Sequence, residues 1–159
     1  MGGIRRLAAI GAATLAVAMV GTGVAAAEPP TEPFVMNLVN ADSGLCLTGT
    51  NEGYDFAVLQ LPCNGSEAQQ WQSAPDNHYL MDLQFKRCIA ALPNTSQVKT
   101  YPCWWKNGQP YDPKQGWGFA QGSTPTRFSN DGLCLGILPG NSWIRRLDCN
   151  SGARVTWYR

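Results

Sequence analysis

The chain opens on a hydrophobic stretch unlike anything that follows it. After Arg5 and Arg6, a run made almost entirely of Ala, Val, Leu, Ile and Gly extends to about Val24, and three alanines follow. A basic start, an apolar segment and small residues at the cleavage point are typical of a secretory signal peptide. We therefore expect a signal peptide at 1–27 and a short linker at 28–33. The alternative is an uncleaved membrane anchor, because the run nears the length of a spanning helix.

Beyond the leader, short β-prone stretches alternate with turn-forming residues. Residues 34–39 partly alternate between apolar and polar side chains, a polar and Gly-containing turn follows, and a second apolar stretch begins at Cys46. The same order recurs at 79–85 and at 126–135. No segment after the leader keeps a helical apolar stripe over three turns, and Gly and Pro are spread throughout. The pattern predicts an all-β fold.

Three copies of one spaced pattern divide this region. Cysteines occur in three pairs with similar spacing, namely Cys46 and Cys63 (17 residues apart), Cys88 and Cys103 (15), and Cys134 and Cys149 (15). A tryptophan follows each pair after 8, 14 and 8 residues, at Trp71, Trp117 and Trp157. Repeats of this length fit either propeller blades or a closed three-fold barrel. Three copies are few for a propeller, and closure into one barrel removes exposed edge strands.

The six cysteines indicate disulfides in an oxidising compartment. An even number of cysteines in an exported chain is typical of a disulfide framework, although six thiols allow fifteen pairings. A zinc site is the rival interpretation, but it needs close pairs such as Cys-x-x-Cys, and no two cysteines here are that near each other.

Length and charge exclude several classes of function. Cleavage after residue 27 would leave 132 residues, enough for one domain, with 10 basic and 11 acidic side chains in no like-charged block. Nucleic acid and anionic membrane surfaces are therefore not expected partners, because both require clustered Lys and Arg. We expect no membrane insertion after signal cleavage. The only histidine is His78, and no nucleophile elbow, phosphate loop or metal-binding His pair is present, so we expect no enzyme, no metal and no cofactor.

The sequence around these cysteines and tryptophans resembles the ricin B-type lectin repeat. The matching motifs are Gly44-x-Cys46-Leu47 with Gln69-x-Trp71, then Gln115-x-Trp117, then Gly132-x-Cys134-Leu135. Lys86 replaces the glycine of the second copy, and Val155 replaces the glutamine of the third. The Ala- and Gly-rich leader suggests a secreted bacterial member. The resemblance implies a β-trefoil over 34–159 with pseudo-three-fold symmetry and the tryptophans in its core. It also implies one disulfide per repeat, pairing Cys46–Cys63, Cys88–Cys103 and Cys134–Cys149.

The sugar-binding motifs of the resembled family are degenerate here. Such a pocket uses an Asp two positions after the first cysteine, an aromatic residue two positions before the second, and an Asn beside the Gln of Gln-x-Trp. The three repeats hold Thr48, Ala90 and Gly136 at the Asp position, Leu61, Tyr101 and Leu147 at the aromatic position, and Ala68, Lys114 and Arg154 at the Asn position. Only Tyr101 keeps its role. Ordinary lectin sites are therefore not expected in the first and third repeats.

The second repeat carries six extra residues between its second cysteine and its tryptophan. The stretch 104–114 contains three aromatic residues, two prolines and a glycine. These aromatic side chains either cap the end of the barrel or form a recognition surface for a sugar or a protein. We expect the ligand site here, with an aromatic face, a carboxylate at Asp112 in place of the missing Asp, and added polar contacts. The candidate residues are Lys99, Tyr101, Trp104, Trp105, Tyr111, Asp112 and Gln115.

Two functions remain open. The first is a secreted, non-catalytic, lectin-like module that binds carbohydrate through the second repeat. The second is a protein-binding trefoil with an extracellular protein partner, either a hydrolase inhibitor or the cell-binding subunit of a toxin. A carboxylate and an aromatic side chain around one pocket would favour the sugar, whereas a broad apolar patch without a carboxylate would favour the protein.

Overall fold

The computed structural model describes residues 33–51, 56–73, 79–106, 109–110, 112–119 and 125–159. The expected signal peptide, nearly all of the linker, His78 and Tyr111 lie outside the described residues, and so does the side chain of Trp105. The described chain consists of β-strands and three short 3₁₀ turns. No helix among the described residues has the length and apolar character needed to cross a membrane.

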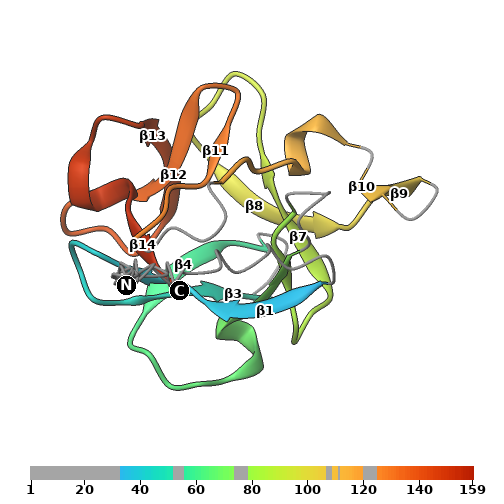
Figure 1. Ribbon diagram of the computed structural model, residues 1–159, viewed down its shortest axis with the longest axis horizontal. Coiled ribbons are helices and arrows are strands. Elements are labelled where there is room, and N and C mark those ends of the chain that lie inside the picture. The colour runs from blue at the N-terminus through green and yellow to red at the C-terminus, as the bar shows by residue number, and fades with distance from the viewer. Residues whose placement is uncertain (1–32, 52–55, 74–78, 107–108, 111, 120–124) are drawn as a thin grey trace, which may run out of the picture.

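Within the described ranges, fourteen short strands form four sheets (Figure 1). The five-stranded sheet, in the order β1-β5-β6-β7-β8, comprises Phe34–Asn37, Gln70–Ser73, Met81–Asp82, Arg87–Ala91 and Val98–Pro102. The four-stranded sheet, β14-β2-β3-β4, comprises Trp157–Tyr158, Val39–Asn40, Cys46–Gly49 and Val58–Leu61. The others are β11-β12-β13, at Ser129–Asn130, Leu133–Ile137 and Ile144–Asp148, and β10-β9, at Gln109–Pro110 and Trp105–Lys106. The 3₁₀ turns are η2 at Glu67–Gln69, η3 at Pro113–Gln115 and η4 at Gly152–Val155.

One antiparallel hairpin stands at the centre of each repeat: β3–β4, β7–β8 and β12–β13. The registers match, because each first cysteine lies opposite the residue two positions before the second cysteine. The pairs are Cys46 with Leu61, Cys88 with Tyr101, and Cys134 with Leu147. This register brings each cysteine pair together with Cα atoms 4.9–5.0 Å apart, and the expected pairing within repeats is confirmed.

The three repeat tryptophans occupy equivalent positions in the core. Trp71, Trp117 and Trp157 have no exposed surface. Each indole Nε1 donates to the backbone oxygen of the residue after a first cysteine. The acceptors are Leu47 O (2.9 Å), Ile89 O (3.0 Å) and Leu135 O (2.9 Å). The tryptophans therefore fill the core and also tie each hairpin to the segment that closes its repeat.

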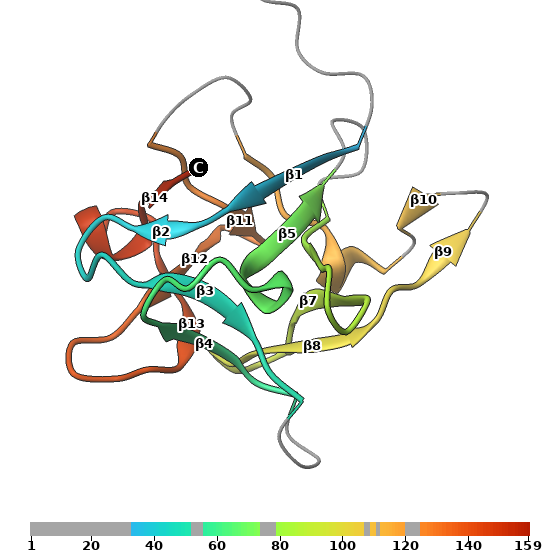
Figure 2. The ribbon, with the colours of Figure 1, turned by 90° about the horizontal axis from the view of Figure 1, so that it is seen from below.

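The hairpins also meet one another around the pseudo-three-fold axis. Equivalent backbone bonds join Gln60 N to Ser142 O (2.7 Å), Thr100 N to Phe56 O (2.9 Å) and Arg146 N to Ser96 O (2.7 Å). Figure 2 shows β4, β8 and β13 gathered on one side of the molecule, with β1 and β2 on the other. Matching hairpins, disulfides and hydrogen bonds in three repeats confirm the expected β-trefoil.

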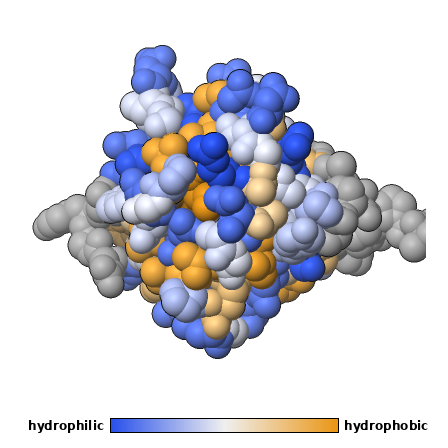
Figure 3. All heavy atoms as spheres, turned by 90° about the vertical axis from the view of Figure 1, so that its left-hand side faces the viewer, coloured by the Kyte–Doolittle hydropathy of each residue, from blue (hydrophilic) through white to orange (hydrophobic). Residues whose placement is uncertain are grey.

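The surface mixes apolar and polar residues. On the face turned toward the viewer in Figure 3, hydrophobic residues form small groups separated by hydrophilic ones. Among the described residues, the large hydrophobic side chains that stay exposed are Val35, Leu61, Tyr101, Trp104, Leu138, Trp143 and Tyr158.

Candidate functional site

The second repeat has a small projection between Cys103 and Trp117, where its sequence is longer than that of the other repeats. After Cys103 the chain runs through the two-stranded β9–β10 ribbon, which stands out from the barrel at the right of Figure 1, and returns through η3 to Trp117. The disulfide at Cys103 and the buried Trp117 fix both ends of this excursion to the barrel. The sequence folds back at η3 because Pro113 suits the first position of such a turn and Asp112 caps it.

A cavity of about 220 Å³ lies between the β7–β8 hairpin and the base of this projection. Its lining includes Ala90, Tyr101, Trp104, Asp112, Lys114 and Gln115. Four of the seven residues expected from the sequence therefore meet at one hollow, although they come from both sides of the projection. Ala90 lies on the wall at the position where the resembled family has its Asp, and Lys114 lies where that family has its Asn.

The two aromatic side chains of this pocket remain accessible to solvent. Tyr101 is 38% exposed and Trp104 is 58% exposed, whereas Trp117 is completely buried a short distance along the chain. A ring that capped the barrel end would lose most of its surface to the core. The exposure of Trp104 thus fits a recognition surface better than a cap.

Asp112 is both a structural cap and an available acceptor. Its Oδ1 accepts a hydrogen bond from the backbone N–H of Lys114 at 2.9 Å, which caps η3. Among the described residues, no other group bonds to this half-buried carboxylate. One carboxylate oxygen can therefore serve a ligand hydroxyl while the other holds the turn.

Gln115 is a buried residue that holds the backbone of the pocket in place and presents almost no surface to a ligand. It is 1% exposed, its Nε2 donates to Pro102 O at 3.0 Å, and its Oε1 accepts from Trp104 N at 3.1 Å. Gln69 makes the same pair of bonds in the first repeat, to Pro62 O and from Asn64 N. The glutamine of Gln-x-Trp is thus a backbone clamp, and in the second repeat it positions Trp104.

We expect Gln115→Leu to lower the free energy of unfolding by about 1–3 kcal/mol, because it leaves a partly buried backbone donor and acceptor without partners. Urea denaturation measures the change. Gln69→Leu is the matched control and should cost a similar amount, since the first repeat uses the same clamp. A Gln115→Leu protein as stable as the wild type would show that the clamp is not needed.

The other three expected site residues are not among those that the structure places at this pocket. Lys99 lines a separate hollow of about 150 Å³ with Trp143 and Arg145, so its position does not support the expectation that it adds a polar contact to the site. Tyr111 lies outside the described residues. For Trp105 the structure describes only the backbone, in β9.

The equivalent positions in the other repeats are filled by the protein itself. In the first repeat, Thr48 is buried and its Oγ1 donates to Cys46 O and accepts from Gln69 Nε2. In the third repeat, a Cβ on Gly136 would lie 2.7 Å from Val155 Cγ1, so no carboxylate side chain fits there. Within the ranges that the structure describes, no three His, Cys, Asp or Glu side chains could together hold a metal ion.

Comparison with solved structures places this geometry among known trefoils. The designed three-fold symmetric protein ThreeFoil aligns with a TM-score of 0.64 at 18% identity, over 78% of this chain and 96% of that one. A ricin B-like lectin from Macrolepiota procera in complex with lactose aligns with a TM-score of 0.61 at 13% identity, over 79% and 93%. The haemolytic lectin CEL-III aligns with a TM-score of 0.66 at 18% identity over 80% of this chain, which spans only 33% of CEL-III. At these identities the likeness establishes the fold.

Sequence comparison identifies the family. No curated protein matched the sequence of the chain. The family model of the ricin-type beta-trefoil lectin domain matches residues 34–157, which include all three disulfides and all three core tryptophans. The chain therefore belongs to the ricin-type beta-trefoil lectin domain family.

Proposed function

We propose that the protein is a secreted, non-catalytic carbohydrate-binding module whose ligand site is the pocket of the second repeat. The observation that carries the proposal is the meeting of two exposed aromatic side chains, Tyr101 and Trp104, with the carboxylate of Asp112 at one cavity. Trp105 and Tyr111, on the same projection, are proposed as further contacts. Gln115 is proposed as a positioning residue.

The chemistry of a sugar matches these groups. A pyranose ring has an apolar face that stacks on an aromatic ring, and hydroxyls that donate to a charged acceptor. Tyr101 supplies a ring at the stacking position of the family, and Trp104 adds a larger one. Asp112 supplies an oxygen whose hydrogen-bonding capacity its capping bond does not exhaust.

Export supports the same function. The leader at 1–27 has the composition of a signal peptide, typical of bacteria, and all six cysteines are in disulfides, as in proteins of oxidising compartments. Solved relatives of this fold hold lactose or N-acetyl-D-lactosamine. We therefore propose galactose-containing glycans as the first ligands to test.

The second candidate is a protein-binding trefoil. The exposure of Trp104 favours it, because exposed tryptophans are frequent hot spots of protein interfaces. The two candidates differ at Asp112. A sugar needs its carboxylate as a hydroxyl acceptor, whereas an apolar protein contact does not.

We expect Tyr101→Ala and Trp104→Ala each to weaken binding to lactose-type glycans by about ten- to a hundredfold, the loss typical of hot-spot aromatics. The melting temperature should hardly change, since both rings are exposed. A glycan array followed by titration calorimetry measures the affinity. Asp112→Asn, which can still cap η3 through its amide oxygen, should also weaken sugar binding.

Two exposed aromatics away from the pocket provide matched controls. Trp143 is 37% exposed and Tyr158 is 46% exposed, and Trp143→Ala and Tyr158→Ala should leave glycan affinity unchanged. Equal losses from the pocket and control variants would contradict the site. Binding to an extracellular protein that needs Trp104 but not the Asp112 carboxylate would favour the second candidate.

A further inference from the structure

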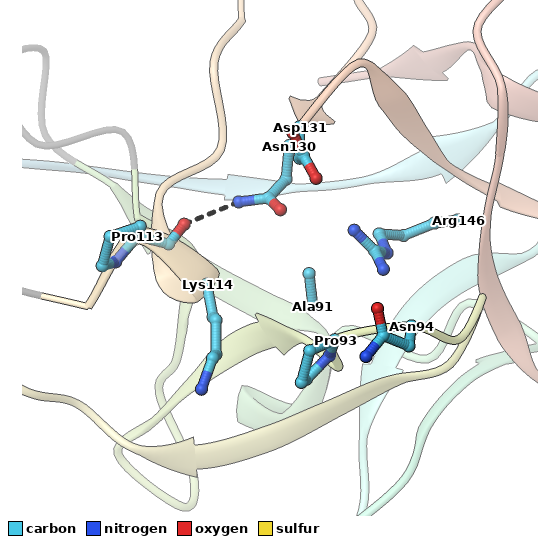
Figure 4. Close-up of a pocket in the computed structure, with 8 residues that line it drawn as sticks. All are labelled: Ala91, Pro93, Asn94, Pro113, Lys114, Asn130, Asp131 and Arg146. Carbon is cyan, nitrogen blue, oxygen red and sulfur yellow. Dashed lines mark hydrogen bonds between the residues drawn. The ribbon is translucent and has the colours of Figure 1, made fainter.

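A second, larger cavity adjoins the proposed sugar pocket. It has a volume of about 450 Å³ and lies where the second and third repeats meet (Figure 4). Its polar lining consists of Asn94, Lys114, Asn130, Asp131 and Arg146. The two cavities share Ala91, Pro93 and Lys114, so one extended ligand can reach both.

Arg146 brings a buried, uncompensated charge to this cavity. The side chain is only 8% exposed, and Figure 4 shows it reaching into the space between the Asn130 and Asn94 sides. Its Nη2 donates to Leu92 O at 2.8 Å and to Thr95 O at 2.6 Å, while its buried Nε has no hydrogen-bond partner. No carboxylate among the described residues lies within 4.0 Å of the guanidinium. A buried charge without a counter-ion is costly, so an anion is the natural complement of this site.

The fold itself does not require a cation here. By their equivalent hairpin bonds, Gln60 and Thr100 occupy the same position in the other repeats, and both are neutral. The Nε2 of Gln60 donates to the neighbouring hairpin at Asn141 O (2.7 Å), much as the Nη2 of Arg146 does. A neutral amide can thus make the side-chain hydrogen bond between neighbouring hairpins. This structural role therefore does not explain the charge of Arg146.

The other polar groups around the cavity favour an anion on balance. Lys114 provides a second, exposed cation on the wall shared with the sugar pocket. Asp131 is the one acidic residue of the described lining, and it is exposed. The Nδ2 of Asn130 is already bonded to Pro113 O and Gly116 O, so it is not available to a ligand.

We infer that this cavity receives the anionic group of an acidic glycan, a carboxylate or a sulfate, while a neighbouring neutral sugar ring occupies the Tyr101–Asp112 pocket. Arg146 and Lys114 hold the anionic group. This inference rests on the proposed function, because it takes the first pocket as the sugar site. It adds the class of glycan that the protein selects.

Three related probes test the inference: lactose, 3′-sialyllactose and 3′-sulfolactose, titrated into the full mature chain. We expect at least one of the two acidic sugars to bind about tenfold or more tightly than lactose. A preference for one acidic sugar identifies whether the anionic group is a carboxylate or a sulfate. The preference should shrink in 0.5 M NaCl, because salt screens attraction between charges.

Variants connect the preference to the cavity. Arg146→Gln removes the charge and introduces the residue type that the first repeat has at the equivalent position, Gln60. Lys114→Gln changes an exposed residue. Both variants should therefore fold. Each should reduce the ratio of acidic-sugar affinity to lactose affinity severalfold. Arg146→Gln should also leave the lactose affinity itself unchanged, because Arg146 does not line the first pocket. Arg146→Lys should retain part of the preference. Arg145→Gln removes the same charge from the preceding residue, which lines the separate hollow with Trp143. This control should not change the preference for the acidic sugar.

The possible failures are distinguishable. Binding of all three sugars with equal affinity would overturn this inference and leave the proposed function standing. A preference for acidic sugars that persists in both Arg146→Gln and Lys114→Gln would place the anion elsewhere and also overturn it. If none of the glycans on the array or the three probes binds, the proposed function and this inference fail together.

Discussion

Replacing Trp71 by alanine should lower the free energy of unfolding by about 3–5 kcal/mol, enough to unfold much of a marginally stable domain. The indole has no exposed surface and packs within the main hydrophobic cluster, so its removal leaves a cavity. The change also leaves Leu47 O, which now accepts from Nε1 at 2.9 Å, without its buried donor.

Thermal or urea unfolding followed by circular dichroism measures this loss. Trp117→Ala and Trp157→Ala should cost similar amounts, because both residues are fully buried and make the same kind of bond. Trp104→Ala is the matched control, since that ring is 58% exposed and should contribute little to stability. An unchanged melting temperature for Trp71→Ala would mean that the repeat tryptophans are not equivalent core residues.

The fold was predictable because its determinants recur at fixed spacing. Each cysteine pair closes a hairpin whose two strands adjoin in sequence, so the register that joins Cys88 to Cys103 follows from a short loop. Each tryptophan then bonds to the start of its own repeat. The β-trefoil itself was expected from the resemblance of these repeats to the ricin B-type lectin repeat.

The candidate site was predictable only in part. The unusual composition of the inserted stretch pointed to this part of the chain. Tyr101, Trp104 and Asp112 meet there because the disulfide at Cys103 and the hydrogen bonds of Gln115 close the base of the projection. Lys99 was expected to add a polar contact to the site. It lines another hollow because the pocket is bounded by the returning segment at Asp112, not by the whole length of β8.

The contribution of Arg146 could not be read from the sequence. Its neighbours Leu92 and Thr95 lie more than fifty residues away, and they come close only because the hairpins of the second and third repeats meet. A side chain whose surroundings come from a different repeat has no local signal, and an arginine in a strand resembles any solvent-facing one.

Asp82 is a second residue whose role is visible in the hydrogen bonds but not in the sequence. Its segment has little sequence similarity to the first repeat, yet Asp82 occupies the position equivalent to Asn40. Gly44 N donates to Asn40 O, and Lys86 N donates to Asp82 O. Ala41 N and Leu83 N each donate to the residue before a core tryptophan, Thr156 and Gln70. The first repeat therefore has an amide where the second has a carboxyl group.

Both polar atoms of the Asn40 amide make hydrogen bonds, whereas only one oxygen of the Asp82 carboxyl group does. The Nδ2 of Asn40 donates to Arg154 O and Thr156 O, and its Oδ1 accepts from the turn. The Oδ1 of Asp82 accepts from Phe85 N, but its buried Oδ2 has no partner and lies against Gly49. A proton on Oδ2 would supply the donor that the amide supplies in the first repeat.

Burial accordingly raises the pKa of Asp82 from 3.8 to about 6, with a small further rise from Glu67. Backbone N–H groups of Phe85 and Gln84 and the charge of Lys86 oppose the rise without cancelling it. A pKa that is higher in the folded protein favours the protonated form. The stability that this group contributes is complete below about pH 3.8 and falls as pH rises to about 6, where the loss levels off. The loss is on the order of 3 kcal/mol, since one pKa unit corresponds to about 1.4 kcal/mol.

Asp82→Asn should therefore stabilise the protein at neutral pH, by up to about 3 kcal/mol, and much less at pH 3.5. The amide keeps the acceptor for Phe85 N and supplies a donor in place of the unpartnered Oδ2, as in Asn40. Urea denaturation of both proteins at several pH values between 3.5 and 7.5 isolates the effect, because other carboxylates titrate equally in each and cancel in the difference. Asp42→Asn, which makes the same chemical change at an exposed turn position, is the control substitution. If the difference for Asp82→Asn were flat with pH, Asp82 would be ionised at no cost in the fold, and its Oδ2 would have to be solvated by water.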